Sequence, residues 1–225
     1  DLEALRAQVA DAARRLAEEG LLIGTAGNVS ALDPGTGLVA ITATGVVLGE
    51  CTPEDVSVVD PSGSLVAGDL EPTSELGLHL AVISTYGVGA VVHTHAPNAT
   101  AVSCVRDDLP VLHYQQLALG GAIRVAPYET FGTPALAAGV VEALRDRSGA
   151  LMANHGAVTH GATVAKAVEN ALLLEWCCRL FRHAATLGTP RELDDQQQLA
   201  VIEAAIARDY GSTRAARPET EEGST

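Results

Sequence analysis

Positive charge is scarce in this chain, and lysine is almost absent. Its 225 residues include 14 lysines and arginines against 28 aspartates and glutamates, a formal net charge of −14. Nucleic-acid binding draws much of its affinity from lysine and arginine on phosphates, so this composition argues against a nucleic-acid partner. Lys166 is the one lysine and has no other polar machinery beside it in sequence, which disfavours Schiff-base chemistry. An anionic substrate would need local positive potential from a metal or from helix N-termini.

The chain also lacks long apolar runs and CxxC cysteine pairs. Hydrophobic residues make up 47%, enough for a sizeable core, but the longest apolar stretches are far below the ~20 residues of a membrane helix. We therefore expect no membrane partner. The spacing of Cys51, Cys104, Cys177 and Cys178 favours neither a disulfide framework nor a thiolate metal site. A reducing cytoplasm is the simplest location for such a chain.

The hydrophobic pattern predicts one α/β domain over residues 1–210, followed by a disordered tail at 211–225. Several strand pairs read as hairpins, which favours a mixed, mostly antiparallel central sheet with helices on its faces over a doubly wound fold. No internal repeat is visible. We expect helices at 2–19, 74–86, 98–105, 134–145, 163–187 and from 194; strands at 39–42, 56–60, 89–95, 123–126, 149–154 and 157–159; and a loop at 21–30.

Two histidines at the end of an apolar run indicate a metal site. A strand alternates its faces residue by residue, so His93 and His95 point the same way. His155 stands in a similar setting after a second apolar run. Three histidines suit zinc and leave a coordination position open, as a catalytic metal requires. His79, on an expected helix, could also approach the metal, whereas the remaining histidines lack such an arrangement.

Two small-residue segments and one helix start complete the candidate site. The hydroxyls of Thr73 and Ser74 and the first amides of the helix can bind an anion. Glu75 follows at once; a carboxylate here is ordinarily a partner of the helix dipole, but beside three candidate ligands it becomes a candidate general base. The loop 24–30 lets backbone amides approach a ligand and offers Asn28 as a donor, and the turn 42–45 is a weaker signal of the same kind.

Taken in order, the motifs GTAGNVS, TATG, PTSE, HTHA, HY (113–114), APYETFGT (126–133) and NHG resemble the class II, zinc-dependent sugar-phosphate aldolase family, and most of all its fuculose-phosphate branch. The resemblance covers about residues 5 to 210. It implies a class II aldolase/adducin-head fold, one Zn²⁺ per subunit and a C4 homotetramer with sites at subunit interfaces. It further implies reversible cleavage of a ketose 1-phosphate, L-fuculose 1-phosphate or a 5-deoxypentulose phosphate, into dihydroxyacetone phosphate and an aldehyde such as lactaldehyde.

The resemblance also assigns roles residue by residue. His93, His95 and His155 match the zinc ligands, and Glu75 matches the acid/base carboxylate. Tyr114 matches a tyrosine that an adjacent subunit supplies to protonate the aldehyde oxygen. Tyr210 falls where a tail tyrosine shapes the aldehyde pocket. The phosphate-binding positions are matched by Asn28, Thr44, Gly45, Thr73 and Ser74, with Thr25 as a neighbour.

Other functions on this scaffold stay open. A dehydratase or decarboxylase would use the same zinc and carboxylate. An epimerase is disfavoured because 115–123 offers no acidic residue, and an adducin-like protein would be expected to lack the zinc histidines. A non-catalytic assembly module with a structural zinc would need four protein ligands and no phosphate affinity.

Overall fold

The computed structural model describes residues 2–208 and 210, and these residues fall into two compact units that divide between Glu192 and Leu193. The second unit contains α6 (Asp195–Arg208). Its start is a capping box: the Gln197 amide donates to the side chain of Asp194, and the Asp194 amide donates back to that of Gln197. The expected tail, 211–225, lies outside the described residues, and the domain boundary at 210 stays a prediction.

A nine-stranded sheet is the centre of the first unit as far as the chain is described, in the order β4-β3-β2-β1-β5-β9-β8-β7-β6. Every pairing is antiparallel except that of β7 with β8. The predicted mixed, mostly antiparallel sheet is thus confirmed. The strands are β1 (Asn28–Leu32), β2 (Val39–Thr42), β3 (Val56–Val59), β4 (Leu65–Ala67), β5 (Ala90–Thr94), β6 (Asp108–Leu109), β7 (Ile123–Ala126), β8 (Gly149–Met152) and β9 (Gly156–Gly161).

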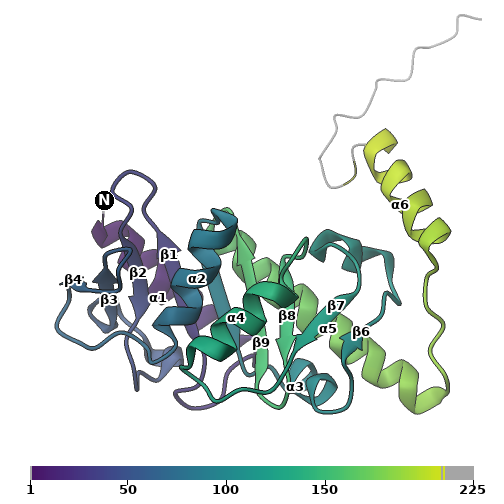
Figure 1. Ribbon diagram of the computed structural model, residues 1–225, viewed down its shortest axis with the longest axis horizontal. Coiled ribbons are helices and arrows are strands. Elements are labelled where there is room, and N and C mark those ends of the chain that lie inside the picture. Colours follow the sequence, from purple (N-terminus) through teal and green to yellow (C-terminus); the bar gives the residue numbers. More distant parts are fainter. Residues whose placement is uncertain (1, 209, 211–225) are drawn as a thin grey trace, which may run out of the picture. The chain divides into compact units, whose positions relative to one another are not determined.

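Helices cover both faces of this sheet (Figure 1). One core cluster joins the sheet to α1 (Leu2–Glu18), α3 (Pro97–Ser103) and α5 (Val164–Leu187), and the other joins it to α2 (Leu76–Tyr86) and α4 (Pro134–Ala143). The central strand β5 sends Val92 into the first cluster and Val91 into the second, as strand alternation requires. Each fully buried side chain of this size stabilises the fold by about 1.5–3 kcal/mol.

The expected loop at 21–30 is wrong at its last three residues, because β1 begins at Asn28. Val29 and Ala31 are buried, and the strand pairs with β2 on one side and β5 on the other. The small residues before it suggested a loop, but long-range pairing overrides that local signal. Three short 3₁₀ turns, at Leu48–Glu50, Pro53–Asp55 and Tyr114–Leu119, were also not foreseen. No helix in the described part of the chain is long and apolar enough to cross a membrane.

Candidate metal centre and active site

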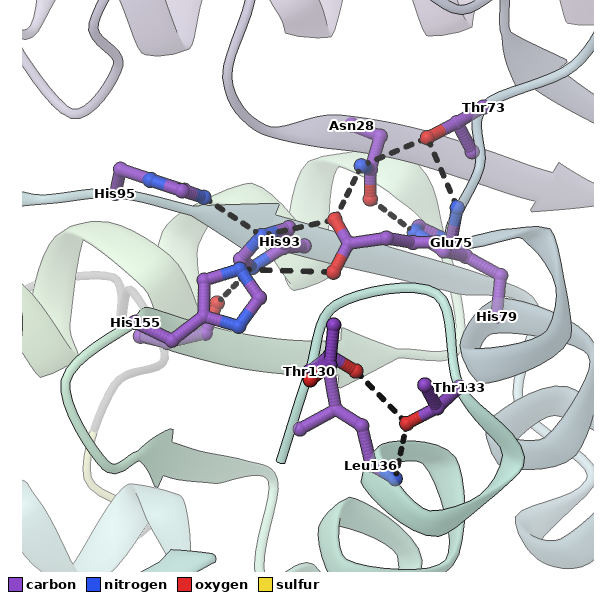
Figure 2. A network of polar contacts seen from close by, with 11 residues as sticks. Asn28, Thr73, Glu75, His79, His93, His95, Thr130, Thr133, Leu136 and His155 are labelled. Atoms are coloured by element: carbon purple, nitrogen blue, oxygen red, sulfur yellow. Dashed lines mark hydrogen bonds and ion pairs between the residues drawn. The ribbon is translucent and has the colours of Figure 1, made fainter. Parts of the chain in front are cut away.

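Three histidines meet at one end of the sheet (Figure 2). His93 is on β5, His95 lies just beyond its end, and His155 lies in the turn between β8 and β9. Their ligand atoms all lie within 4.8 Å of one another. The prediction that His93 and His95 point together is confirmed, but the strand expected to run to 154 ends at Met152, so His155 is on a turn. Asn154, at φ 56°, lets that turn close.

The tautomer of His93 shows that these residues fit a metal ion. Its Nδ1 lies 3.0 Å from the carbonyl oxygen of Ala157, which can only accept, so Nδ1 donates there and Nε2 is the nitrogen that faces the cluster. That Nε2 lies 3.0 Å from Nε2 of His95 and 3.1 Å from Oε2 of Glu75. Contacts this short between nitrogen and oxygen ligand atoms need a proton or a metal ion between them. The donor set therefore suits a divalent metal such as zinc.

The other two imidazoles are poised to be neutral ligands. Burial, together with the nearby charge of His93, lowers the pKa of His95 to about 4. The same causes, in the same order, lower the pKa of His155 below its ordinary value. Because a metal binds neutral imidazole, both side chains are in the binding form at neutral pH.

Glu75 stands beside this cluster at the N-cap of α2. Its Oε2 contacts His93, and its Oε1 lies 3.6 Å from Nε2 of His155 with no hydrogen-bond partner although it is buried. Burial alone raises the pKa of this carboxyl, but the hydrogen bond and charge of His93, helped by Asn28 and His155, hold it below its ordinary range. The result is an ionised carboxylate with one oxygen free for chemistry.

A buried hydrogen-bond network holds Glu75 from the opposite side to the histidines. Nδ2 of Asn28 donates to Oε2 of Glu75 at 2.9 Å and to Oγ1 of Thr73 at 3.1 Å. Oδ1 of Asn28 contacts Nε2 of His79, and Nδ1 of His79 contacts the hydroxyl of Ser30. His79 is not part of the histidine cluster, because both of its ring nitrogens are engaged in this network. His79 is thus near the site as a partner of Asn28, and it is not among the three histidines whose ligand atoms converge.

Backbone pairing brings the remaining predicted site residues together. The Thr44 amide donates to the Glu71 carbonyl at 2.9 Å, and the Thr73 amide donates to the Thr42 carbonyl at 3.1 Å. The turn at 42–45 thus lies against the start of α2, and both border an open cavity of about 500 Å³. The lining includes all six residues predicted to bind phosphate, and also Glu75, His95 and His155: Thr25, Ala26, Gly27, Asn28, Ala43, Thr44, Gly45, Thr73, Ser74, Glu75, His95, Tyr128, Glu129, Phe131, Asn154 and His155.

The segment 126–133 contributes three lining residues, Tyr128, Glu129 and Phe131, to which the sequence assigned no role. The loop fits tightly against the helix start: a Cβ on Gly132, at φ 72°, would lie 2.9 Å from the carbonyl oxygen of Ser74. The available signal in the sequence was the pair of aromatic residues, Tyr128 and Phe131, in a chain with so few aromatics; both side chains are exposed in the structure. None of the described lining residues is a lysine or an arginine.

The two predicted tyrosines lie in different units of the chain. Tyr114 begins the turn Tyr114–Leu119, is 40% exposed, and lies with its ring 4.5 Å from that of His113. It does not belong to the cavity lining. Tyr210 belongs to the second unit, follows α6 and is 65% exposed. The roles of both tyrosines stay predictions.

Comparison with known proteins gives this site a family. Residues 7–181 match the family described as class II aldolase and adducin N-terminal domain. A 5-deoxy-D-ribulose 1-phosphate aldolase of Bacillus thuringiensis serovar kurstaki is 34% identical over 202 residues, 88% of this chain and 95% of that protein. An L-fuculose phosphate aldolase of Escherichia coli strain K12 is 34% identical over 200 residues, 88% of this chain and 92% of that protein.

A solved structure gives the same result. An L-fuculose 1-phosphate aldolase superposes with a TM-score of 0.85 at 32% identity, covering 89% of this chain and 95% of that one. Fold and comparisons thus define a lyase of a family that is generally metal-dependent, and the three clustered histidines could hold such an ion. The chain belongs to the class II aldolase and adducin N-terminal domain family, and it is an enzyme of the class II aldolase type.

Proposed function

We propose that this protein is a zinc-dependent aldolase that reversibly cleaves a ketose 1-phosphate into dihydroxyacetone phosphate and an aldehyde. The observation that carries the proposal is the pairing of an ionised carboxylate, Glu75, with three convergent imidazoles at the edge of a cavity lined by hydroxyls and amides. L-Fuculose 1-phosphate and 5-deoxyribulose 1-phosphate are the leading candidate substrates, because relatives of equal similarity carry those names.

His93, His95 and His155 would hold the metal. When bound, a zinc ion supplies Lewis acidity that stabilises negative charge developing on the ketone oxygen. Zinc is favoured over calcium or magnesium, since the three proposed ligands are imidazoles and not oxygens. The second ring nitrogen of His93 donates to Ala157, which fixes the orientation of the ring.

Glu75 would move the proton at the substrate carbon. In the cleavage direction the C4 hydroxyl passes its proton to a base, the role proposed below for the phenolate of Tyr114 from a neighbouring copy. The C3–C4 bond then breaks to release the aldehyde, and Oε1 of Glu75, after taking a proton from solvent, delivers it to C3 of the enediolate. In synthesis Glu75 removes that proton from dihydroxyacetone phosphate. Oε1 suits this role because it is buried and has no hydrogen-bond partner, whereas Oε2 already accepts a hydrogen bond from Asn28.

Neutral donors would bind the phosphate. Oγ1 of Thr73 already accepts from Asn28 and from the Glu75 amide, so its own hydrogen is free to point at a ligand. Ser74, Thr44 and Thr25 add hydroxyls on the same cavity, and the N-terminus of α2 adds positive potential. Such a site can bind an anion without any lysine or arginine side chain.

We also propose that the active enzyme is a homotetramer whose sites lie at subunit interfaces, with Tyr114 of a neighbouring copy protonating the aldehyde oxygen and Tyr210 shaping the aldehyde pocket. The exposure of Tyr114 and its place outside the cavity lining of its own chain support this arrangement. The described cysteines form no disulfide, which supports a reducing, cytoplasmic setting.

A panel of phosphorylated ketoses tests the proposal. Aldehyde and dihydroxyacetone phosphate should appear from at least one 1-phosphate, stop on addition of a chelator and return with zinc. Release of water or carbon dioxide in place of an aldehyde would instead identify a dehydratase or decarboxylase. Absence of any reaction, together with a fourth protein ligand on the metal, would identify an assembly module.

A further inference from the structure

His79 is a fully buried histidine with both ring nitrogens in use, and the proposed chemistry assigns it no part. It lies on α2 one turn after Glu75, at the i+4 position, so the two side chains lie on the same side of the helix. Asn28, from the neighbouring strand β1, reaches between them (Figure 2). The imidazole is thus linked to the proposed catalytic carboxylate through one amide.

The hydrogen bonds that link Ser30, His79, Asn28 and Glu75 all point the same way, each group donating to the next. A carboxylate can only accept, so the nitrogen of the Asn28 amide faces Glu75 and its oxygen faces His79. Nε2 of His79, 2.5 Å from that oxygen, must then donate, which leaves Nδ1 to accept from the Ser30 hydroxyl at 2.6 Å. Burial lowers the pKa of His79 to about 3, so the ring carries one proton and cannot donate at both ends.

We infer that His79 is a positioning residue for Glu75: it holds the Asn28 amide so that both amide hydrogens face Glu75 and Thr73. This inference rests on the proposed function of Glu75. The Asn28 amide restrains Oε2 of Glu75 and leaves Oε1 without a hydrogen-bond partner beside His155. The hydrogen-bonded series from His79 through Asn28 to Glu75, here called the relay, thus selects which carboxylate oxygen meets the substrate. With His79 unable to donate, the amide could rotate and turn its oxygen toward the carboxylate, which would displace Glu75.

A matched pair of substitutions separates this role from simple core packing. In His79→Gln the amide group reaches the place of Nε2 and can still donate to Asn28, whereas in His79→Asn it reaches only the place of Nδ1. We expect His79→Asn to lower kcat and the rate of proton exchange on dihydroxyacetone phosphate by about 10–100-fold, with little change in KM or zinc content. His79→Gln should stay within about threefold of the wild type.

Nitrogen-15 NMR of the zinc-loaded wild type gives a readout independent of activity. The His79 resonances, assigned in the wild type from their through-space contacts with Ser30 and Asn28, should show the Nε2–H tautomer. In Ser30→Ala the loss of the hydroxyl that Nδ1 accepts from should shift part of the population to the Nδ1–H tautomer, with a smaller loss of kcat than in His79→Asn.

The outcomes separate the relay from the proposed function. An Nδ1–H tautomer in the wild type would overturn the relay, even if the His79 variants did not fold. Equal rates in His79→Gln and His79→Asn, whether high or low, would overturn it as well. If the wild type exchanged no proton of dihydroxyacetone phosphate, the proposed function would fall, whereas the tautomer would still report whether His79 orients Asn28.

Discussion

Nε2 of His93 and Oε2 of Glu75 lie 3.1 Å apart, so a proposed metal ligand and the proposed catalytic carboxylate are within hydrogen-bond distance of each other. One comes from the central strand β5 and the other from the N-cap of α2. Because of this contact, a cation held by the histidines would also stabilise the negative charge of Glu75. Because the two proposed roles belong to different residues, separate substitutions can test metal binding and proton transfer.

Replacing the carboxylate should remove proton transfer but keep the metal. For Glu75→Gln we expect exchange of the dihydroxyacetone phosphate proton, followed by NMR in deuterated water, to fall by about 10²–10⁴-fold. Zinc content should be unchanged because the three imidazoles remain. Glu169→Gln, on the exposed face of α5, is the matched control and should exchange like the wild type. Full exchange in Glu75→Gln would remove Glu75 from its role.

Removing one imidazole should remove the metal. His155→Ala leaves two of the three ligands, and we expect zinc affinity to fall by more than about 100-fold, since even the partners of metal ligands cost 10–100-fold when lost. Metal analysis after dialysis measures this directly. His183→Ala, at an exposed position of α5, should keep its metal. Equal zinc content in the two variants would show that the cluster does not bind the ion.

Acid should destabilise the folded chain through His79. Its pKa is about 3 in the fold against an ordinary 6.5, mainly because it is buried, so the unfolded chain takes up the proton first. The stability present above pH 6.5 is lost as the pH falls toward 3, at roughly 1 kcal/mol per pH unit. Urea unfolding in chelator should therefore show a steeper loss between pH 6.5 and 5 for the wild type than for His79→Gln. Parallel curves would contradict this.

The turn that carries His155 should not tolerate a side chain at the next position. A Cβ on Gly156 would lie 2.2 Å from the carbonyl oxygen of Thr94, so β9 and β5 would have to separate. We expect Gly156→Ala to cost about 1–3 kcal/mol in unfolding free energy and to lower zinc affinity. Gly139→Ala, inside α4 with only ordinary contacts, should instead gain about 0.5–1 kcal/mol. A stable, zinc-replete Gly156→Ala would contradict the first expectation.

Sequence patterns predicted the structure well where the geometry depends on residues that are close together in the chain. The convergence of His93 and His95 follows from strand alternation over three residues. Thr163 at the N-cap and Gly188 at the end bound the helix Val164–Leu187 almost as expected, because caps act within one turn. The presence of one lysine, Lys166, with no polar groups beside it already disfavoured a Schiff base, the main alternative to a metal for stabilising an enediolate.

Asn28 shows where local signals end. Glycine and small residues around it predicted a loop, but its strand is made by pairing with residues far along the chain, Asn28 opposite His93. No short-range pattern indicates that partner, and a shift of one position would turn the side chain to the other face of the sheet. The spacing of four between Glu75 and His79 was visible in the sequence, yet without Asn28 between them it carried no meaning.

The amino-acid sequence alone determined the chemistry available to this protein: three imidazoles, one well-placed carboxylate, hydroxyls and amides for an anion, and one lysine. It also determined most helices and strands, since caps and periodicity act over a few residues. Only the tertiary structure decided which atoms meet, above all that His155 reaches the other two histidines from a turn and that Asn28 links His79 to Glu75. Hydrogen bonds are short and directional, so they depend on the register of strands that are distant in sequence.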